Sequence, residues 1–154
     1  MNAQANRAIV RWTPSLVEAR LSEAAFVLKR LPEPRLFGYF STWPEIRHTF
    51  ADQVGQEPRR LRVLPSPQAI SRMEETLSWT VCLEPVDGKI VWMRAFGSRW
   101  REICRTVGLQ RASAHHHWIY GICRISHHLN QQRLNPRLSM QQVIDLARAD
   151  DPAF

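Results

Sequence analysis

The stretch that decides the fold runs from Trp100 to Asn130 and reads WREICRTVGLQRASAHHHWIYGICRISHHLN. Beyond Gly108, apolar residues recur at the spacing of one face of a long helix, namely Ala114, Trp118, Ile122, Ile125 and Leu129. Gly108 is typical of a helix that ends in the left-handed backbone conformation, which glycine adopts at the least cost. The stretch therefore predicts a helix over 98–107, a short turn and a helix over 110–130, meeting at a steep angle as in a helix-turn-helix.

The same pattern predicts which side chains pack between these two helices. Leu109 is expected to fill the corner after the glycine, and Cys104 to lie where the helices cross most closely, because a small side chain is needed there. Trp118 is expected to be buried against the helix that contains Ile103. The opposite, exposed side of the second helix is predicted to carry Ala112, His116, Ile119 and His127.

A further helix is predicted near the start of the chain. Thr13 is a favourable N-cap and Pro14 fits the first helical turn, while Pro32 ends the pattern. The residues between them form an amphipathic stripe of Val17, Leu21, Ala24, Leu28 and Leu31. A stripe of this kind predicts a core-facing or helix-pairing surface.

Ser66 and Pro67 repeat the cap-and-proline signal and predict a helix that continues to about Leu83. Its apolar side is predicted to consist of Ile70, Met73, Leu77 and Val81. Helices over 86–95 and 139–147 are also expected, the latter before a polar tail, ADDPAF. The fold class predicted is all-α, with a helical and loop-rich N-terminal region over 1–64, a helix-turn-helix domain over 65–131, and a short helix and tail over 132–154.

Residues 35–64 are predicted to be irregular, apart from a short helix over 43–54. Five aromatic residues lie close together in this segment: Phe37, Tyr39, Phe40, Trp43 and Phe50. They either form a platform on which bases stack or anchor a loop-rich segment to the core. Arg59, Arg60 and Arg62 follow, and they either touch phosphates or lie in a solvated loop.

Composition narrows the class of protein. The chain has 154 residues, of which 44% are hydrophobic, and a net charge of +7. This charge favours an anionic partner, nucleic acid first and an acidic membrane surface second. No apolar run reaches membrane-spanning length, and the N-terminus lacks the apolar core of a secretory signal. The three cysteines form no C-x-x-C pair and are expected to be reduced thiols in a cytoplasmic protein.

Residues 87–130 resemble the last DNA-binding domain of bacterial sigma factors, region four. The resemblance is carried by Gly108, the Leu109 corner, the segment Arg111-Ala112-Ser113 and the apolar position at Ala114. It implies a helix-turn-helix that binds double-stranded DNA. Ala114 is smaller than the valine or isoleucine usual in that family, and Trp118 is expected to fill the space. The chain lacks the sigma domains that bind core polymerase and melt the promoter, so it is not expected to act as a sigma factor.

A second resemblance spans most of the chain. The segments TPSLVEARL, LPEPR, GYFSTWPEI and PSPQAISRMEETLSW, together with the predicted helix-turn-helix, resemble DUF6362, a proteobacterial and prophage family of unknown function. This resemblance implies a phage or mobile-element setting.

The candidate DNA-binding residues lie around the predicted turn. At the start of the second helix, where a recognition helix contacts base edges, they are Gln110, Arg111, Ser113, His115 and His116. Arg111 can pair with guanine through two hydrogen bonds, and Gln110 with adenine. Arg99 and Arg101, at the start of the preceding helix, suit phosphates. Between residues 89 and 137 the chain has nine basic residues and a single acid, Glu102, as phosphate binding requires.

The histidines at 115–117, 127 and 128 invite a metal site, but one helix does not supply it. Consecutive residues point in different directions, and eleven residues of helix span about 16 Å. DNA contact and a solvated face are the alternatives that remain. Neither a nucleophile motif nor a phosphate loop nor a carboxylate set appears, so an enzyme, a metal and a cofactor are not expected.

The sequence thus predicts a sequence-specific double-stranded DNA-binding protein, used as a transcriptional regulator of phage or mobile-element genes. One alternative is a recognition subunit of phage DNA packaging, similar to a small terminase, that assembles into a ring. Another is an interaction module whose helix-turn-helix docks on RNA polymerase or another protein. A homo-oligomer is compatible with each, and no membrane partner is expected.

Overall fold

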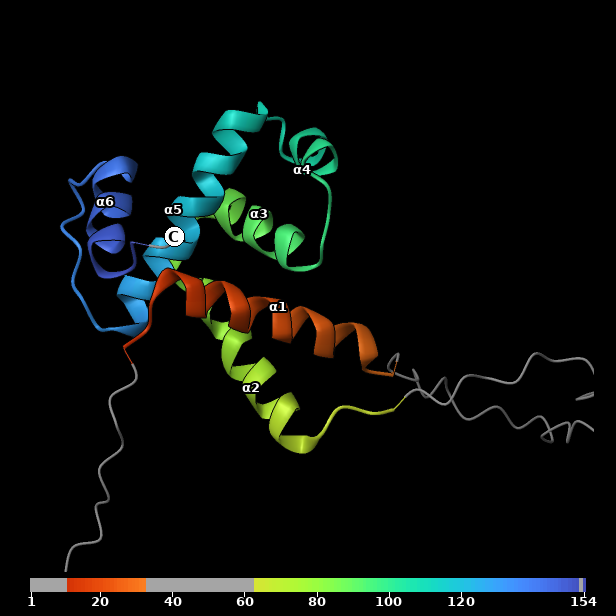
Figure 1. Cartoon of the computed structure of the whole chain (residues 1–154). Helices are drawn as coiled ribbons and strands as arrows, with labels where there is room; N and C mark the ends of the chain where they lie inside the picture. Colours follow the sequence, from red (N-terminus) through yellow and green to blue (C-terminus); the bar gives the residue numbers. More distant parts are fainter. Residues whose placement is uncertain (1–10, 33–62, 153) are drawn as a thin grey trace, which may run out of the picture.

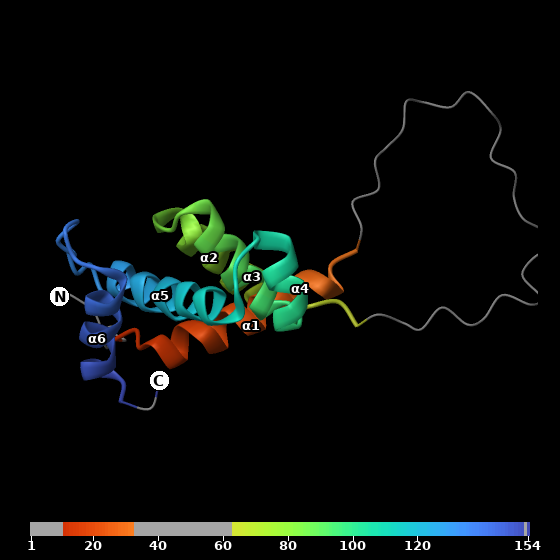
Figure 2. The same cartoon turned by 90° about the horizontal axis from the view of Figure 1, so that it is seen from above.

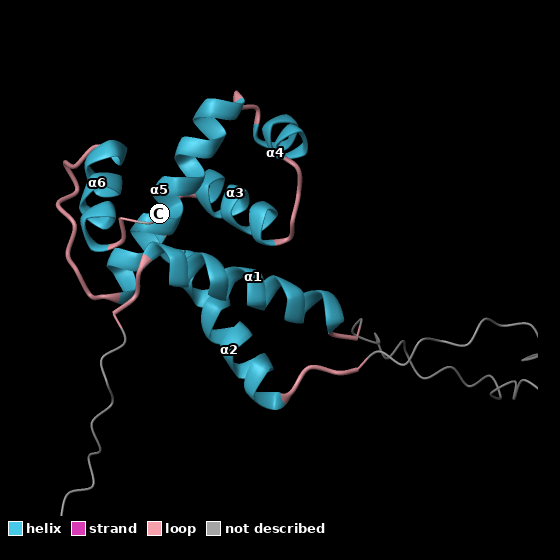
Figure 3. Ribbon diagram, viewed as in Figure 1, coloured by secondary structure: helices cyan, strands magenta, loops and turns pink. Residues whose placement is uncertain are grey.

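The computed structural model describes residues 11–32, 63–152 and 154 (Figure 1). These ranges contain helices and loops but no strand, which confirms the all-α prediction (Figure 3). The elements are α1 (Pro14–Arg30), α2 (Pro67–Ser78), the 3₁₀ turn η2 (Trp79–Cys82), α3 (Pro85–Ala95), α4 (Trp100–Val107), α5 (Arg111–Leu129) and α6 (Met140–Asp150). The predictions for the aromatic segment, the short helix over 43–54 and the arginines at 59, 60 and 62 lie outside the described residues.

The helices begin where the capping pattern predicts. The Thr13 hydroxyl accepts the Leu16 N–H at 3.4 Å, and α1 has proline in its first turn. The Ser66 hydroxyl accepts the Ala69 N–H at 3.2 Å, again before a first-turn proline. At α6 the Ser139 side chain forms a reciprocal capping box with Gln142. Each cap satisfies an N–H that would otherwise lack a partner at the helix start.

Helix α5 lies at the centre of the fold, in contact with α1, α3, α4 and α6 (Figures 1 and 2). The central core consists of Val17, Leu21, Trp79, Val91, Ile122 and Ile125. These residues come from α1, η2, α3 and α5, so the proposed segments 1–64 and 65–131 share one core. Ala114 is buried as well, whereas Leu129 is half-buried against the core. The buried stripe of α5 is thereby confirmed at Ala114, Ile122 and Ile125.

A second cluster joins α1 to α2 through Ala24, Val27 and Met73. The apolar side predicted for α2 is wrong at its end, since Leu77 and Val81 are exposed. The chain changes from α-helix to 3₁₀ turn at Trp79, which alters the rotation per residue. Trp79 continues the buried side formed by Met73 and Thr76, with 3% of its surface exposed, whereas Val81 lies in solvent.

Helix α6 packs on the face of α5 that was predicted to be exposed. Cys123 lies in a cluster with Val143, Ile144 and Ala147, and Ile119 is half-buried against it. The prediction that His127 points outward is wrong: it is buried, with Nδ1 2.5 Å from Gln132 Oε1 and Nε2 3.3 Å from the Val143 carbonyl oxygen. A neutral imidazole has one N–H, which donates to one of these two oxygens and so offsets part of the penalty of burying the ring.

The end of the chain is also packed, so the prediction of a polar tail is wrong. Asp151 is buried and its Oδ2 accepts the Ser15 N–H at 3.1 Å. The Phe154 ring lies 5.9 Å from the ring of Trp118. Among the described residues, no helix is long and apolar enough to cross a membrane.

Candidate nucleic-acid interface

The turn between α4 and α5 has the backbone geometry that the sequence predicts. Gly108 has φ 72° and ψ 23°, in the left-handed region, and its N–H donates to the Cys104 carbonyl at 2.9 Å. Gln110 is extended and is the N-cap of α5, with its carbonyl accepting the Ala114 N–H at 2.8 Å. The two helices are therefore joined by a short, defined turn, with Ile103 and Ala114 fully buried beside it.

A second glycine turn joins α3 to α4. Gly97 has φ 84°, the Ser98 N–H donates to the Met93 carbonyl, and the Gly97 N–H donates to the Arg94 carbonyl. This is a Schellman motif, which satisfies the last carbonyls of α3. The Arg94 guanidinium then closes the turn by donating to the Ser98 carbonyl at 3.1 Å. A left-handed glycine thus lies in the turn before α4, and another directly follows the helix.

An aromatic cluster holds the start of α4 against α5 and the chain end. We use this name for Trp100, His115, Trp118 and Phe154. The rings of Trp100 and His115 lie 5.3 Å apart, and each contacts Trp118, at 6.1 Å and 5.6 Å. Arg94 lies over the Trp100 ring at 4.7 Å, a cation–π contact. Trp118 is half-buried, not buried, and it meets these rings at the start of α4.

Two contacts that the sequence did not reveal set the distance between α3 and α5. Asp87, with 5% of its side chain exposed, accepts from His117 Nδ1 at 2.6 Å. Gly121 faces Val91 so closely that a Cβ atom added there would lie 2.8 Å from Val91 Cγ2. His117 therefore helps to hold α5 against α3. No local pattern signals its pairing with Asp87, which lies thirty residues away in the sequence.

The predicted site residues from Gln110 to His116 lie at the start of α5, whereas Arg99 and Arg101 lie at the start of α4. Gln110, Arg111, Ser113 and His115 are exposed, whereas His116 is half-buried. Arg111, Ala112 and His115 line a shallow, open depression at the start of the helix. The basic side chains of α4 lie nearby in the chain, because Arg99 is its N-cap and Arg101 belongs to its first turn; both are exposed.

His115 lies in a positive field formed by three helices. Burial lowers its pKa from the ordinary value, and the positive charges of Arg111, Arg94, His116 and Arg148 lower it further. These groups belong to α5, α3 and α6. A positive field of this kind favours an anion at the surface.

The packing of α6 limits how much of α5 is available to a partner. From Ile119 onward the face that begins with Arg111 and His115 is covered, since Ile119 and Cys123 lie in the cluster with α6. The free part of α5 is therefore its first two turns, over 111–116. A recognition helix contacts base edges with its N-terminal residues, so the uncovered segment 111–116 is long enough for contacts of this kind.

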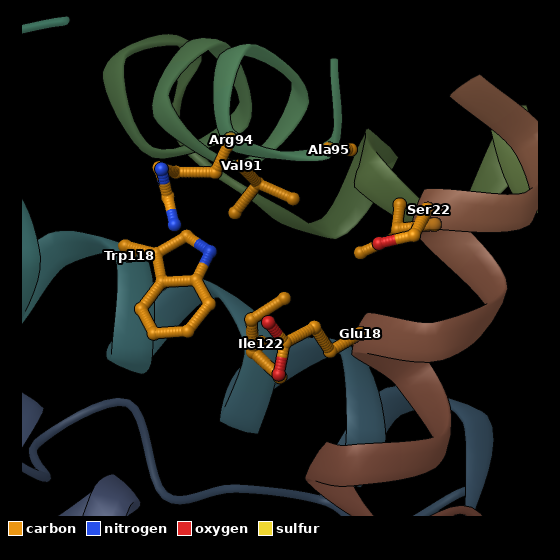
Figure 4. Close-up of a pocket in the computed structure, with 8 residues that line it drawn as sticks. Glu18, Ser22, Val91, Arg94, Ala95, Trp118 and Ile122 are labelled. Atoms are coloured by element: carbon orange, nitrogen blue, oxygen red, sulfur yellow. The ribbon is translucent and has the colours of Figure 1, made fainter. Parts of the chain in front are cut away.

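The described part of the chain also has a small cavity away from the start of α5. A cavity of about 20 Å³ between α1, α3 and α5 is lined by Glu18, Ser22, Arg94 and Trp118, with the Arg94 side chain reaching toward Trp118 (Figure 4). Ligand pockets measure about 300–1,000 Å³, so this cavity is too small for an organic cofactor. Within the described ranges, no three His, Cys, Asp or Glu side chains come together as metal ligands.

The fold and this surface define a class: a small all-α protein with exposed basic residues gathered at the start of its central helix. Residues 29–125 match DUF6362, described as a domain of unknown function, and the chain belongs to this family. The match begins within α1 and ends within α5, so α6 lies beyond it. Neither curated proteins nor solved structures yielded a match. The resemblance to sigma region four and the phage setting stay predictions.

Proposed function

We propose that this chain binds double-stranded DNA, with the first two turns of α5 in the major groove and the start of α4 on the phosphate backbone. The observation that carries the proposal is the side-chain arrangement at the start of α5. Buried Ala114 anchors this turn to the core, while Arg111 is exposed beside it and His115, also exposed, is held by its ring contacts with Trp100 and Trp118. Side chains on a fixed helix present hydrogen-bond donors in one geometry, as base recognition requires.

The roles divide by position. Gln110, Arg111 and Ser113, at the N-terminal end of α5, are proposed to contact base edges. Arg99 and Arg101 are proposed to contact phosphates, which set the register on the duplex without reading sequence. We propose transcriptional regulation of phage or mobile-element genes in the cytoplasm as the use of this binding.

The test begins with selection of bound duplexes from a random pool, followed by affinity measurements over single-base variants of the selected site. Arg111→Ala should relax the preference at one base pair, because an arginine paired with guanine contributes roughly 1–3 kcal/mol of discrimination. Arg101→Ala, the matched control, should weaken all variants alike and reduce the salt dependence. A uniform loss in Arg111→Ala would make Arg111 a phosphate contact and refute the assignment of α5.

Other outcomes would point to the other functions. A ring-shaped oligomer that binds DNA would favour a packaging subunit. A protein whose affinity for duplexes is absent even at low salt would leave docking on RNA polymerase or another protein as the use of this surface, since phosphate contacts always contribute a salt-sensitive affinity.

A further inference from the structure

Helix α6 extends the surface that begins at the start of α5. Ile119 and Cys123, one and two turns beyond His115, pack against α6. Residues three or four apart lie on one side of a helix, so α6 covers the continuation of the side that carries Arg111 and His115. A duplex placed on the first turns of α5 therefore has α6 as its neighbour (Figures 1 and 2).

Arg148 is the one basic residue of α6, and it is exposed. It follows Ala147, which is buried in the cluster with Cys123. The Val143 carbonyl oxygen, near the start of α6, lies 3.3 Å from His127 Nε2, and the Phe154 ring, after its end, lies 5.9 Å from the ring of Trp118. The chain from α6 onward therefore advances along α5 toward the start of that helix, and Arg148 lies on this course. In keeping with this position, its positive charge adds to the burial that lowers the pKa of His115 and opposes in part the burial that raises the pKa of the Cys123 thiol.

The two acids at the end of α6 each contact the segment that begins α1. Asp150 forms an ion pair with Arg11 at 2.5 Å, and Asp151 accepts the Ser15 N–H. Asp150 is thereby paired with Arg11, whereas the charge of Asp151, like that of Arg148, also acts on the Cys123 thiol. The exposed Arg148 is the group of this segment that can reach an anion in solvent.

We propose that Arg148 contacts a backbone phosphate of bound DNA, so that the nucleic-acid surface is built from α4, α5 and α6 together. This inference rests on the proposed function and adds a contact outside the two-helix motif. A phosphate bound beside the start of α5 would be stabilised by the positive charges of Arg111 and Arg148. An arginine matches phosphate oxygens with two parallel hydrogen bonds. Arg148 itself lies beyond residues 29–125, the region that matches the family.

The test compares full-length variants Arg148→Ala, Arg148→Lys and Arg133→Ala on the duplex selected by the wild type. Arg133 is exposed and follows the opposite end of α5, which makes it a matched control. Arg148→Ala should lower the slope of log affinity against log salt by about 0.9, the value for one phosphate contact on B-form DNA. Its preference over single-base variants should stay unchanged. Arg148→Lys should restore most of the slope, and Arg133→Ala should leave it as in the wild type.

A second measurement tests the geometry without DNA. In Arg148→Ala the pKa of His115, followed by its ring NMR signals, should rise because one positive neighbour is removed. An unchanged titration would place Arg148 away from this surface and overturn the inference.

The outcomes separate the two proposals. If Arg111→Ala alters base preference while Arg148→Ala leaves the salt slope intact, the inference fails and the proposed function stands. A changed base preference in Arg148→Ala would also overturn it, since a phosphate contact carries no sequence information. If the wild type lacks salt-sensitive DNA binding, both proposals fail.

Discussion

Replacing Gly121 by alanine should destabilise the protein, although alanine is the better helix former. In the middle of a helix this change ordinarily stabilises by about 0.8–1.0 kcal/mol. At this position the new Cβ would lie 2.8 Å from Val91 Cγ2, and Val91 is fully buried between α1, α3 and α5. Overpacking of this kind costs about 1–3 kcal/mol. The net expectation is a loss of roughly 1 kcal/mol in the free energy of unfolding.

Gly88 is the matched control, because it also lies within a helix but has no atom within 4 Å of an added Cβ. Gly88→Ala should therefore raise the free energy of unfolding by about 0.5–1 kcal/mol. The two variants, measured by urea denaturation at constant pH, should differ by roughly 1.5–2 kcal/mol in opposite directions.

A double-mutant cycle identifies the cause. If the clash is with Val91, Gly121→Ala should cost less in a Val91→Ala background, giving a favourable coupling energy. Equal stabilisation by Gly88→Ala and Gly121→Ala would refute the close approach of α3 and α5. A cycle with zero coupling would place the strain on another neighbour.

Three further predictions concern the aromatic cluster, His115 and the buried thiol. Trp118→Ala should lower the free energy of unfolding by about 3 kcal/mol, the lower end for large aromatic truncations, because the ring is half-buried; an unchanged thermal midpoint would show that its ring contacts contribute nothing. His115 ionises below its ordinary pKa in the free protein, and a nearby phosphate would stabilise its charged form, so DNA affinity should rise as pH falls below about 6.5 and stay level above it. Anisotropy titrations should show this rise in the wild type and lose it in His115→Gln; an identical pH profile for both would exclude a contact through His115. Burial raises the pKa of Cys123 to about 12, so iodoacetamide at pH 7 should label half-buried Cys104 in the native protein but Cys123 only after unfolding; peptide mass spectrometry that finds both labelled at one rate in the native state would contradict this.

Local signals predicted the helix starts and the α4–α5 turn, whereas long-range packing escaped them. Thr13, Ser66 and Gly108 act through hydrogen bonds and backbone angles within a few residues, which the sequence displays directly. The surroundings of α5 follow no such signal. It is covered by α1 and α3 on one side and by α6 on another, and a helix covered on several sides has no single apolar stripe. The polar residues of α5 therefore do not mark its exposed side. This is why the prediction that His127 is exposed is wrong.

In the candidate site, too, local features could be predicted from the sequence and long-range contacts could not. The first turn of α5 could be placed from the sequence, because Gly108 fixes where the helix begins. The roles of the neighbouring histidines depended on partners far along the chain: Asp87 for His117, and Arg94 and Arg148 for His115. Arg148 itself carried no signal, since only the docking of α6 brings it beside α5.

The start of α1 has a consequence for the order in which the chain folds during synthesis. The Trp12 carbonyl accepts hydrogen bonds from the Ser126 hydroxyl and the Asn130 amide, which lie 114 and 118 residues later in the chain. The Ser15 N–H donates to Asp151, which lies 136 residues later. At about 5–20 residues per second the ribosome takes on the order of ten seconds to deliver these partners. During that interval Val17 and Leu21 lack the α5 side chains that bury them. Helix α1 is made before the other described helices but is thus among the last of them to be fully enclosed, and its apolar stripe is the surface on which a nascent-chain chaperone would act.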